Sequence, residues 1–268
     1  MLKNLELDET TWVPREIQWF INHQKDDGHR AEQLADDGDP TRRQLIHLYR
    51  LYQETCEKSG LVDFAELLLR AFELWKNNPE ILARYRRRFR HILVDEFQDT
   101  NRLQYQWLKL LAGPNNTIFA VGDDDQSIYA FRGAHAGNML DLEKDFRIEK
   151  VIKLEQNYRS HGNILDAANA LIRHNRTRLG KNLWTSEGSG EQLRVYEAMT
   201  DLEEAAYILD EVRQLHNEGV ALSDMALLYR SNAQSRVLEH ALFNAGISYR
   251  VYGGLRFFER QEIKNALA

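Results

Sequence analysis

The sequence predicts an α/β fold built around parallel strands. Two short apolar runs, residues 91–94 and 117–121, each lead into a cluster of acidic residues. Such runs are typical of buried parallel strands that deliver polar groups to one edge of a sheet. After residue 150, apolar runs alternate with stretches of helical periodicity, which is the pattern of an α/β sheet with flanking helices.

The first region, residues 1–90, is predicted to be helical. Leu45, Leu48 and Tyr49 recur at helical spacing. Asp63 precedes the largely apolar run 64–69, and Glu66 lies three residues after Asp63, as at a capped helix start. Residues 84–90 are rich in arginine, which suits either a solvated helix face or a nucleic-acid contact.

The remaining chain is predicted to form two α/β segments, residues 91–150 and 151–268. In the first, a helix at 102–111 separates the strands at 91–94 and 117–121. In the second, strands are expected at 151–154, 193–198, 225–229 and 248–252, and helices at 162–174, 201–217, 233–245 and from about 260.

Composition narrows the functional classes. The 268 residues are 43% hydrophobic and 28% charged, which excludes a disordered or low-complexity chain. No apolar run is long enough to span a membrane, so no membrane partner is expected. Cys56 is the single cysteine, which suits the cytosol. The net charge of −6 argues against a basic nucleic-acid coat, but a local DNA channel remains compatible with it.

The strongest chemical motif is residues 93–99, where an apolar strand ends at Asp95 and Glu96. Ligands of open α/β sheets bind at this end of the strands. Asp95 can hold Mg²⁺ through water, and Glu96 can accept a proton from an attacking water. The plainer alternative is two solvated acids, with Asp99 or Asn101 capping the next helix.

Two further motifs follow predicted strands. In residues 121–133, Gln126 is an amide that can both donate and accept hydrogen bonds. Tyr129, Phe131 and Arg132 are suited to base stacking and phosphate contact, although the aromatics could equally belong to the core. In residues 154–160, Arg159 can stabilise phosphoryl charge and the neighbouring tyrosine can stack on a base; the alternative is a salt-bridged arginine and a buried tyrosine.

These three motifs, in this order, resemble the superfamily-1 DNA helicases of the UvrD/Rep/PcrA group, and the UvrD branch most closely. Residues 60–68, 228–236 and 252–260 match the same group. The resemblance covers essentially the whole chain. It implies parts of two RecA-like domains, preceded by a helical inserted domain that would end within residues 1–90.

The resemblance also implies roles for the motif residues in an ATP-driven motor that moves 3′ to 5′ on single-stranded DNA. Asp95 and Glu96 would be the Walker B pair, for Mg²⁺ and water activation. Gln126 would sense the γ-phosphate, Arg159 would contact it, and Tyr158 would stack on adenine.

Other residues would contact single-stranded DNA or a junction between single and double strands. Tyr129 and Phe131 match base-contacting positions of the family, with Arg132 beside them. Phe131 stands where the family usually has tryptophan, which predicts weaker stacking. Arg256 is a further candidate DNA contact. Repair-complex proteins are possible partners by the same resemblance.

One family motif does not occur. The P-loop, G-x-x-x-x-G-K-[ST], cradles phosphates with its backbone and lysine, and Gly180-Lys181 does not fit it because Asn182 follows and Asn175 stands at the first glycine position. We therefore expect an internal piece of a helicase that hydrolyses ATP negligibly alone. The alternatives are an ATPase-dead module that binds DNA or a protein partner, and an inert remnant that folds poorly.

Overall fold

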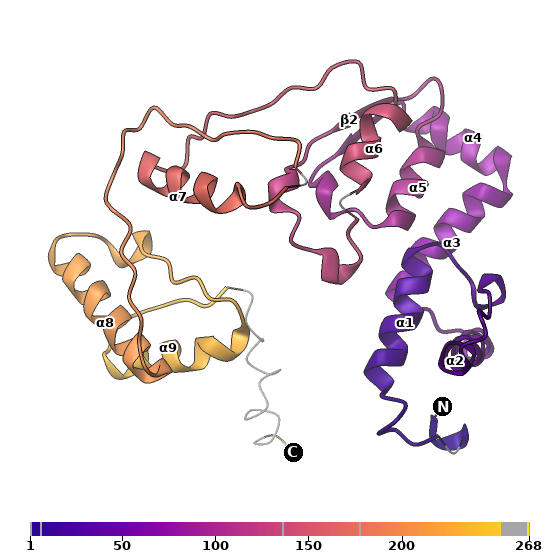
Figure 1. The fold of residues 1–268 in the computed structure, drawn as a ribbon, viewed down its shortest axis with the longest axis horizontal. Helices are drawn as coiled ribbons and strands as arrows, with labels where there is room; N and C mark the ends of the chain where they lie inside the picture. The colour runs from indigo at the N-terminus through magenta and orange to yellow at the C-terminus, as the bar shows by residue number, and fades with distance from the viewer. Residues whose placement is uncertain (1, 6, 136, 177, 253–266, 268) are drawn as a thin grey trace. The chain divides into compact units, whose positions relative to one another are not determined.

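The computed structural model describes residues 2–5, 7–135, 137–176, 178–252 and 267 (Figure 1). The chain divides into two compact units, Met1–Glu191 and Gln192–Ala268. The domain boundary that the sequence suggests near residue 150 lies inside the first unit and stays a prediction. We describe each unit by itself.

Four helices open the first unit: α1 (Pro14–Asp26), α2 (Pro40–Lys58), α3 (Phe64–Asn77) and α4 (Pro79–Arg88). Proline occupies the first position of three of them, where its missing N–H is not needed. The Asp63 side chain accepts a hydrogen bond from the Glu66 N–H at 2.7 Å and so caps α3. The helical prediction for residues 1–90 is thus confirmed where the structure describes them.

A parallel pair of strands, β1 (His91–Val94) and β2 (Thr117–Ala120), follows these helices. The register places Leu93 opposite Phe119 and Val94 opposite Ala120. Between the strands runs α5 (Arg102–Leu111), which begins after Asn101. The Asn101 side chain accepts from the Gln104 N–H, and the Gln104 side chain accepts from the Asn101 N–H, both at 2.8 Å. The predicted Asn101 cap is therefore present.

The two faces of this sheet differ. Ile92 is buried and packs in a cluster with Trp75, Leu82 and Tyr105, and Ile118 packs against the same cluster. The alternate residues Leu93 and Phe119 point to the other face and are 76% and 59% exposed. Among the described residues, helices therefore cover one face of the sheet and leave the other open.

Two more α-helices complete the first unit: α6 (Gly137–Asp145), which lies beside α5 in Figure 1, and α7 (Gly162–Ile172). The second unit has α8 (Asp201–Asn217) and α9 (Asn232–Asn244), which pack on each other. The helices predicted at 102–111 and 201–217 have the bounds of α5 and α8. Those predicted at 162–174 and 233–245 differ from α7 and α9 by one or two residues at their ends.

Four predicted strands are wrong for the described residues. The segments 151–154, 193–198, 225–229 and 248–252 form no ladder, and the nearest feature is an isolated parallel bridge between Gln156 and Trp184. A strand is defined by its backbone hydrogen bonds to a neighbouring strand, and these segments have no such neighbour among the described residues. Their apolar side chains stay outside a core: Val195 and Leu228 are each 96% exposed. The helix expected from about residue 260 lies outside the described residues.

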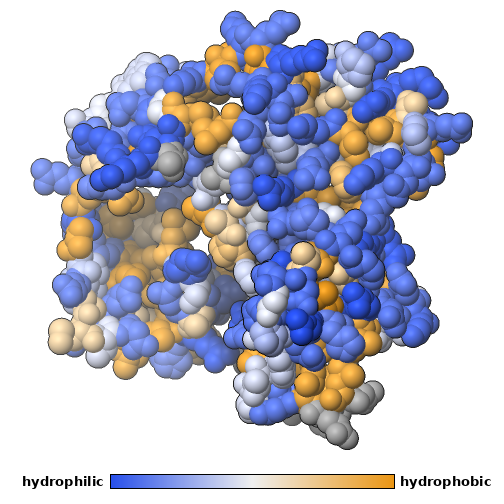
Figure 2. Space-filling view, turned by 45° about the vertical axis from the view of Figure 1, so that its right-hand side comes forward, coloured by the Kyte–Doolittle hydropathy of each residue, from blue (hydrophilic) through white to orange (hydrophobic). Residues whose placement is uncertain are grey.

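Apolar residues reach the surface in several places, as orange patches among hydrophilic side chains in Figure 2. A search of the helices in the described part of the chain finds none with the length and hydropathy to cross a membrane.

Candidate active site

The candidate site begins where β1 ends. Asp95 and Glu96 follow the strand directly, and both are exposed. The Glu96 N–H donates to Oδ1 of Asp95 at 3.0 Å. Glu96 has φ 49° and ψ 45°, a left-handed backbone conformation that residues other than glycine seldom adopt. The chain therefore turns sharply at Glu96, and both carboxylates lie at the carboxyl end of the strand.

Gln98 links this carboxylate pair to the second motif, a role that the sequence did not predict. Gln98 is 2% exposed. Its Nε2 donates to Oε2 of Glu96 at 2.7 Å, and its Oε1 accepts from the Asp123 N–H at 2.9 Å. A glutamine after a strand is most often a solvated residue, so no feature of the sequence marks Gln98 as a buried bridge.

The hydrogen bonds of Gln98 require a glycine at position 122, because a side chain there would collide with Gln98 and Phe97. A Cβ at Gly122 would lie 2.8 Å from Oε1 of Gln98 and 3.2 Å from the backbone nitrogen of Phe97. The Phe97 N–H itself donates to the Val121 carbonyl oxygen at 3.0 Å. Close approach of two backbone segments is a common reason for glycine in a strand extension, and here it brings the two motifs together.

Gln126 lies in the short 3-10 turn η4 (Asp124–Gln126) after β2. Its Nε2 donates to Oδ2 of Asp123 at 2.7 Å, and its N–H donates to the Asp123 carbonyl oxygen at 2.9 Å. Asp123 is in turn fixed by Gln98. A continuous set of hydrogen bonds therefore runs from Glu96 through Gln98 and Asp123 to Gln126.

The stacking candidates follow in η5 (Ala130–Arg132). The rings of Tyr129 and Phe131 lie 5.9 Å apart at 44° to each other, and Phe131 is 64% exposed. The alternative that placed both aromatics in the core is wrong for Phe131. Arg132 belongs to the same turn by its backbone, and its side chain lies outside the described atoms, as does the whole of Arg256.

Tyr158 and Arg159 form a separate part of the candidate site. Tyr158 is 79% exposed and its hydroxyl donates to Oε1 of Gln156 at 3.0 Å. Arg159 is exposed, and its N–H donates to Oδ1 of Asn157 at 2.9 Å. The alternative of a buried tyrosine is therefore wrong. Among the described residues, no hydrogen bond or ion pair joins Tyr158 or Arg159 directly to Asp95, Glu96 or Gln126.

The arginine-rich segment at 84–90 is partly structural. Arg86, on α4, donates from Nε to the Leu110 carbonyl oxygen at 2.9 Å and so ties α4 to α5. Arg84, Arg87, Arg88 and Arg90 are exposed.

Oxygen ligands for a hard cation occur at two places. Asp95 is exposed, and no hydrogen bond from a described residue reaches its Oδ2, so this carboxylate fits the water-mediated binding that Mg²⁺ favours. Carboxylate oxygens of Asp123, Asp124 and Asp125 lie within 4.8 Å of one another. However, protein cations and an N–H group already occupy those three carboxylates.

Comparison with known proteins gives the family of the chain. Residues 1–147 match the UvrD/REP helicase N-terminal domain, and residues 152–268 match the UvrD-like helicase C-terminal domain. DNA helicase II of Escherichia coli K12 is 54% identical over 268 residues. The ATP-dependent DNA helicase PcrA of Leuconostoc citreum is 42% identical over 270 residues.

Each alignment takes in the whole of this chain but only 37% and 36%, respectively, of those two relatives. The chain thus spans little more than a third of their length. Two models of one helicase family match successive parts of the chain, and the first covers more than half of it. The chain belongs to the UvrD/REP helicase family.

Proposed function

We propose that this chain carries the central part of an ATP-driven motor that moves 3′ to 5′ on single-stranded DNA and unwinds duplexes at junctions. The observation that carries the proposal is the hydrogen-bonded path from Glu96 through Gln98 to the turn that holds Gln126. It puts a carboxylate suited to activating water and an amide suited to sensing phosphate at the same end of two parallel strands, where ligands of such sheets bind.

The proposed chemistry is hydrolysis of ATP. Glu96 accepts a proton from water as the water oxygen attacks the γ-phosphorus and the bond to the bridging oxygen breaks. Asp95 would hold Mg²⁺, which when bound neutralises developing charge on the phosphates. Gln126 and Arg159 would donate hydrogen bonds to the γ-phosphate, and the Tyr158 ring would stack on adenine.

The phosphate cradle is not among these residues. The 268 residues contain no G-x-x-x-x-G-K-[ST] sequence, the loop whose backbone N–H groups and lysine cradle the β- and γ-phosphates. The chain thus fits the metal and water side of the reaction but not the phosphate-binding side. We therefore expect negligible hydrolysis by the chain alone.

The DNA side of the proposal rests on aromatic and basic residues. Phe131 offers an exposed ring and Tyr129 lies beside it, an arrangement that suits stacking on successive bases. Arg132 and Arg256 remain candidate DNA contacts. Work on DNA would place the protein in the bacterial cytosol, at the nucleoid, with repair-complex proteins as further candidate partners.

Replacing Glu96 tests the catalytic assignment. We would use a chimeric helicase in which this chain replaces the matching segment of E. coli DNA helicase II, which supplies the rest of the motor. Glu96→Gln keeps the side-chain shape and removes the base, so DNA-stimulated ATP turnover should fall on the order of 10²–10⁴-fold. The exposed Glu149, replaced by Gln, is the matched control and should leave turnover unchanged. Equal rates for Glu96→Gln and its parent would refute the assignment.

A further inference from the structure

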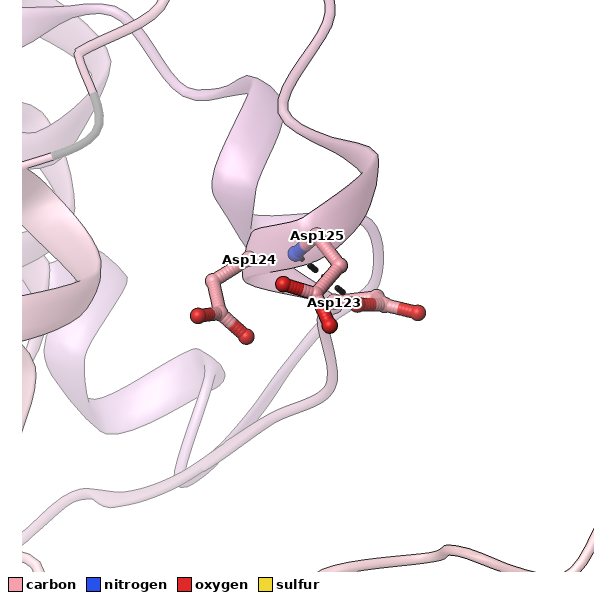
Figure 3. Close-up of side chains that lie close together, drawn as sticks. All are labelled: Asp123, Asp124 and Asp125. Atoms are coloured by element: carbon pink, nitrogen blue, oxygen red, sulfur yellow. Dashed lines mark hydrogen bonds between the residues drawn. The ribbon is translucent and has the colours of Figure 1, made fainter. Parts of the chain in front are cut away.

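Three consecutive aspartates beside Gln126 are held by a basic segment from elsewhere in the chain. Figure 3 shows Asp123, Asp124 and Asp125 grouped at η4. Arg178 donates from Nε and Nη2 to both carboxylate oxygens of Asp125, at 2.9 and 2.6 Å. Lys181 pairs with Asp123. We call these two ion pairs the arginine–lysine clamp.

The clamp is largely shielded from solvent. The side chains of Arg178 and Asp125 are 15% and 11% exposed, and those of Lys181 and Asp123 are 17% and 22% exposed. Burial alone would raise the pKa of Asp123, but hydrogen bonds from Lys181 and Gln126 outweigh it and leave the pKa below its ordinary value. A two-pronged arginine contact also fixes geometry more firmly than a single charge does.

The backbone reinforces the same contact. The Leu179 N–H donates to Oδ2 of Asp124 at 2.6 Å. Nη2 of Arg178 also donates to the Lys181 carbonyl oxygen at 2.9 Å, which closes the segment 178–181 on itself. All three aspartates therefore have protein partners, and a metal ion would have to displace them.

One end of the clamp reaches the γ-phosphate sensor candidate. Asp123, which pairs with Lys181, also accepts from Nε2 of Gln126 at 2.7 Å. Asp125, which pairs with Arg178, directly precedes Gln126. Both ion pairs thus involve residues joined to Gln126, Asp123 by hydrogen bonds and Asp125 along the chain.

The other end reaches the segment that carries Arg159. The Asn182 N–H donates to Oε1 of Glu155 at 3.2 Å, and the Trp184 N–H donates to the Glu155 carbonyl oxygen at 3.0 Å. The Asn157 N–H donates to the Trp184 carbonyl oxygen at 2.7 Å. Tyr158 and Arg159 follow Asn157 directly. The clamp therefore joins residues 123–125, which lie in the part of the chain that matches the helicase N-terminal domain, with residues 178–181, which lie in the part that matches the C-terminal domain.

We propose that Arg178 and Lys181 are positioning residues that set Gln126 against the segment bearing Arg159 for ATP hydrolysis. The proposal rests on the function proposed above, because it concerns the same site. Neither residue touches the reacting atoms in this role. Their effect passes through Asp125 and Asp123, so breaking an ion pair should slow the chemical step more than it weakens ATP binding.

The first test is a double-mutant cycle in the chimeric helicase, with Arg178→Gln, Asp125→Asn and the combination of both. DNA-stimulated kcat should fall roughly 10–100-fold in each single variant, because small misplacements cost this much. KM for ATP should change far less. The double variant should be no worse than the poorer single one, and Arg178→Lys should recover part of kcat. The exposed Arg176, changed to Gln, is the control and should keep kcat.

A second test separates this proposal from the proposed function. In the 268-residue chain, Arg178→Gln should speed amide hydrogen exchange at Leu179 and Asn182, which the clamp protects, while Arg176→Gln should not. If the parent chimera fails to hydrolyse ATP, the proposed function fails. The exchange result then still decides whether the arginine–lysine clamp holds the segment 178–181 in place. Unchanged exchange, or an unchanged kcat in an active chimera, would overturn the positioning role.

Discussion

At the residue scale, some side chains of the site can be recognised in the sequence, and at least one is revealed only by its surroundings. Asp95, Glu96 and Gln126 follow predicted strands and can be singled out from the sequence, since polar residues at strand ends are the usual ligand positions. Gln98 cannot be singled out in that way. Its two hydrogen bonds exist because Gly122 lets the backbone of residues 121–123 approach Phe97.

Phe131 provides a prediction at this scale. It is 64% exposed beside Tyr129, an arrangement that suits stacking on a base. In the chimeric helicase, Phe131→Ala should weaken binding of a single-stranded oligonucleotide by about 1–3 kcal/mol, or roughly 5–150-fold, as measured by fluorescence anisotropy. Phe131→Trp should bind at least as tightly as the parent. The control is Phe243→Ala, at an exposed ring on α9; an equal loss there would rule out a specific stacking role for Phe131.

At the element scale, helices were easier to predict than strands. The bounds of α5 and α8 follow from local groups: Asn101 with Gln104 caps one, and the Thr200 side chain, accepting from the Glu203 N–H, caps the other. The strands β1 and β2 formed as predicted because each supplies the other's ladder. The four strands predicted after residue 150 lack such neighbours in the described chain, and a sequence pattern does not reveal whether a partner strand is present.

The contact between α1 and α3 supplies a prediction about stability. Lys25 is 2% exposed and bonds to Asp63 at 2.7 Å and to Glu66 at 2.9 Å. Lys25→Gln would leave the buried Glu66 and the half-buried Asp63 short of one cation. It should therefore lower the free energy of unfolding by about 3 kcal/mol, as measured by urea denaturation of the 268-residue chain. Lys58→Gln, at an exposed position, should change it by less than about 0.5 kcal/mol.

The pH dependence of the free energy of unfolding shows whether Lys25→Gln destabilises the fold through lost charge pairing. Burial alone would raise the pKa of Glu66, but hydrogen bonds from Arg70, Lys25 and Arg30 lower it to about 2. Because the folded pKa lies below the ordinary value, Glu66 stabilises the fold above about pH 4.5, and this contribution is lost as the pH falls toward 2. Lys25→Gln should flatten this part of the stability profile. A parallel downward shift at every pH would instead point to lost packing.

At the scale of the whole molecule, the chain carries the residues proposed for the metal and water side of a nucleotide site, but its sequence has no G-x-x-x-x-G-K-[ST] motif. The family could be predicted from the three motifs, since their residue types and spacing are specific. The path from Glu96 to Gln126 and the arginine–lysine clamp could not, because both depend on contacts between segments distant in sequence. The open face of the sheet, with Leu93 and Phe119 exposed, also becomes apparent only in three dimensions.

The most direct test compares DNA-stimulated ATP turnover by the 268-residue chain alone and by the chimeric helicase. We predict background turnover for the chain alone, because its sequence has no G-x-x-x-x-G-K-[ST] motif to cradle the phosphates. The chimera should show clear turnover, and Glu96→Gln in the chimera should lower it on the order of 10²–10⁴-fold. Turnover by the chain alone that Glu96→Gln abolishes would show that a P-loop is not needed. A folded but inactive chimera would contradict the motor function and favour a module that only binds DNA.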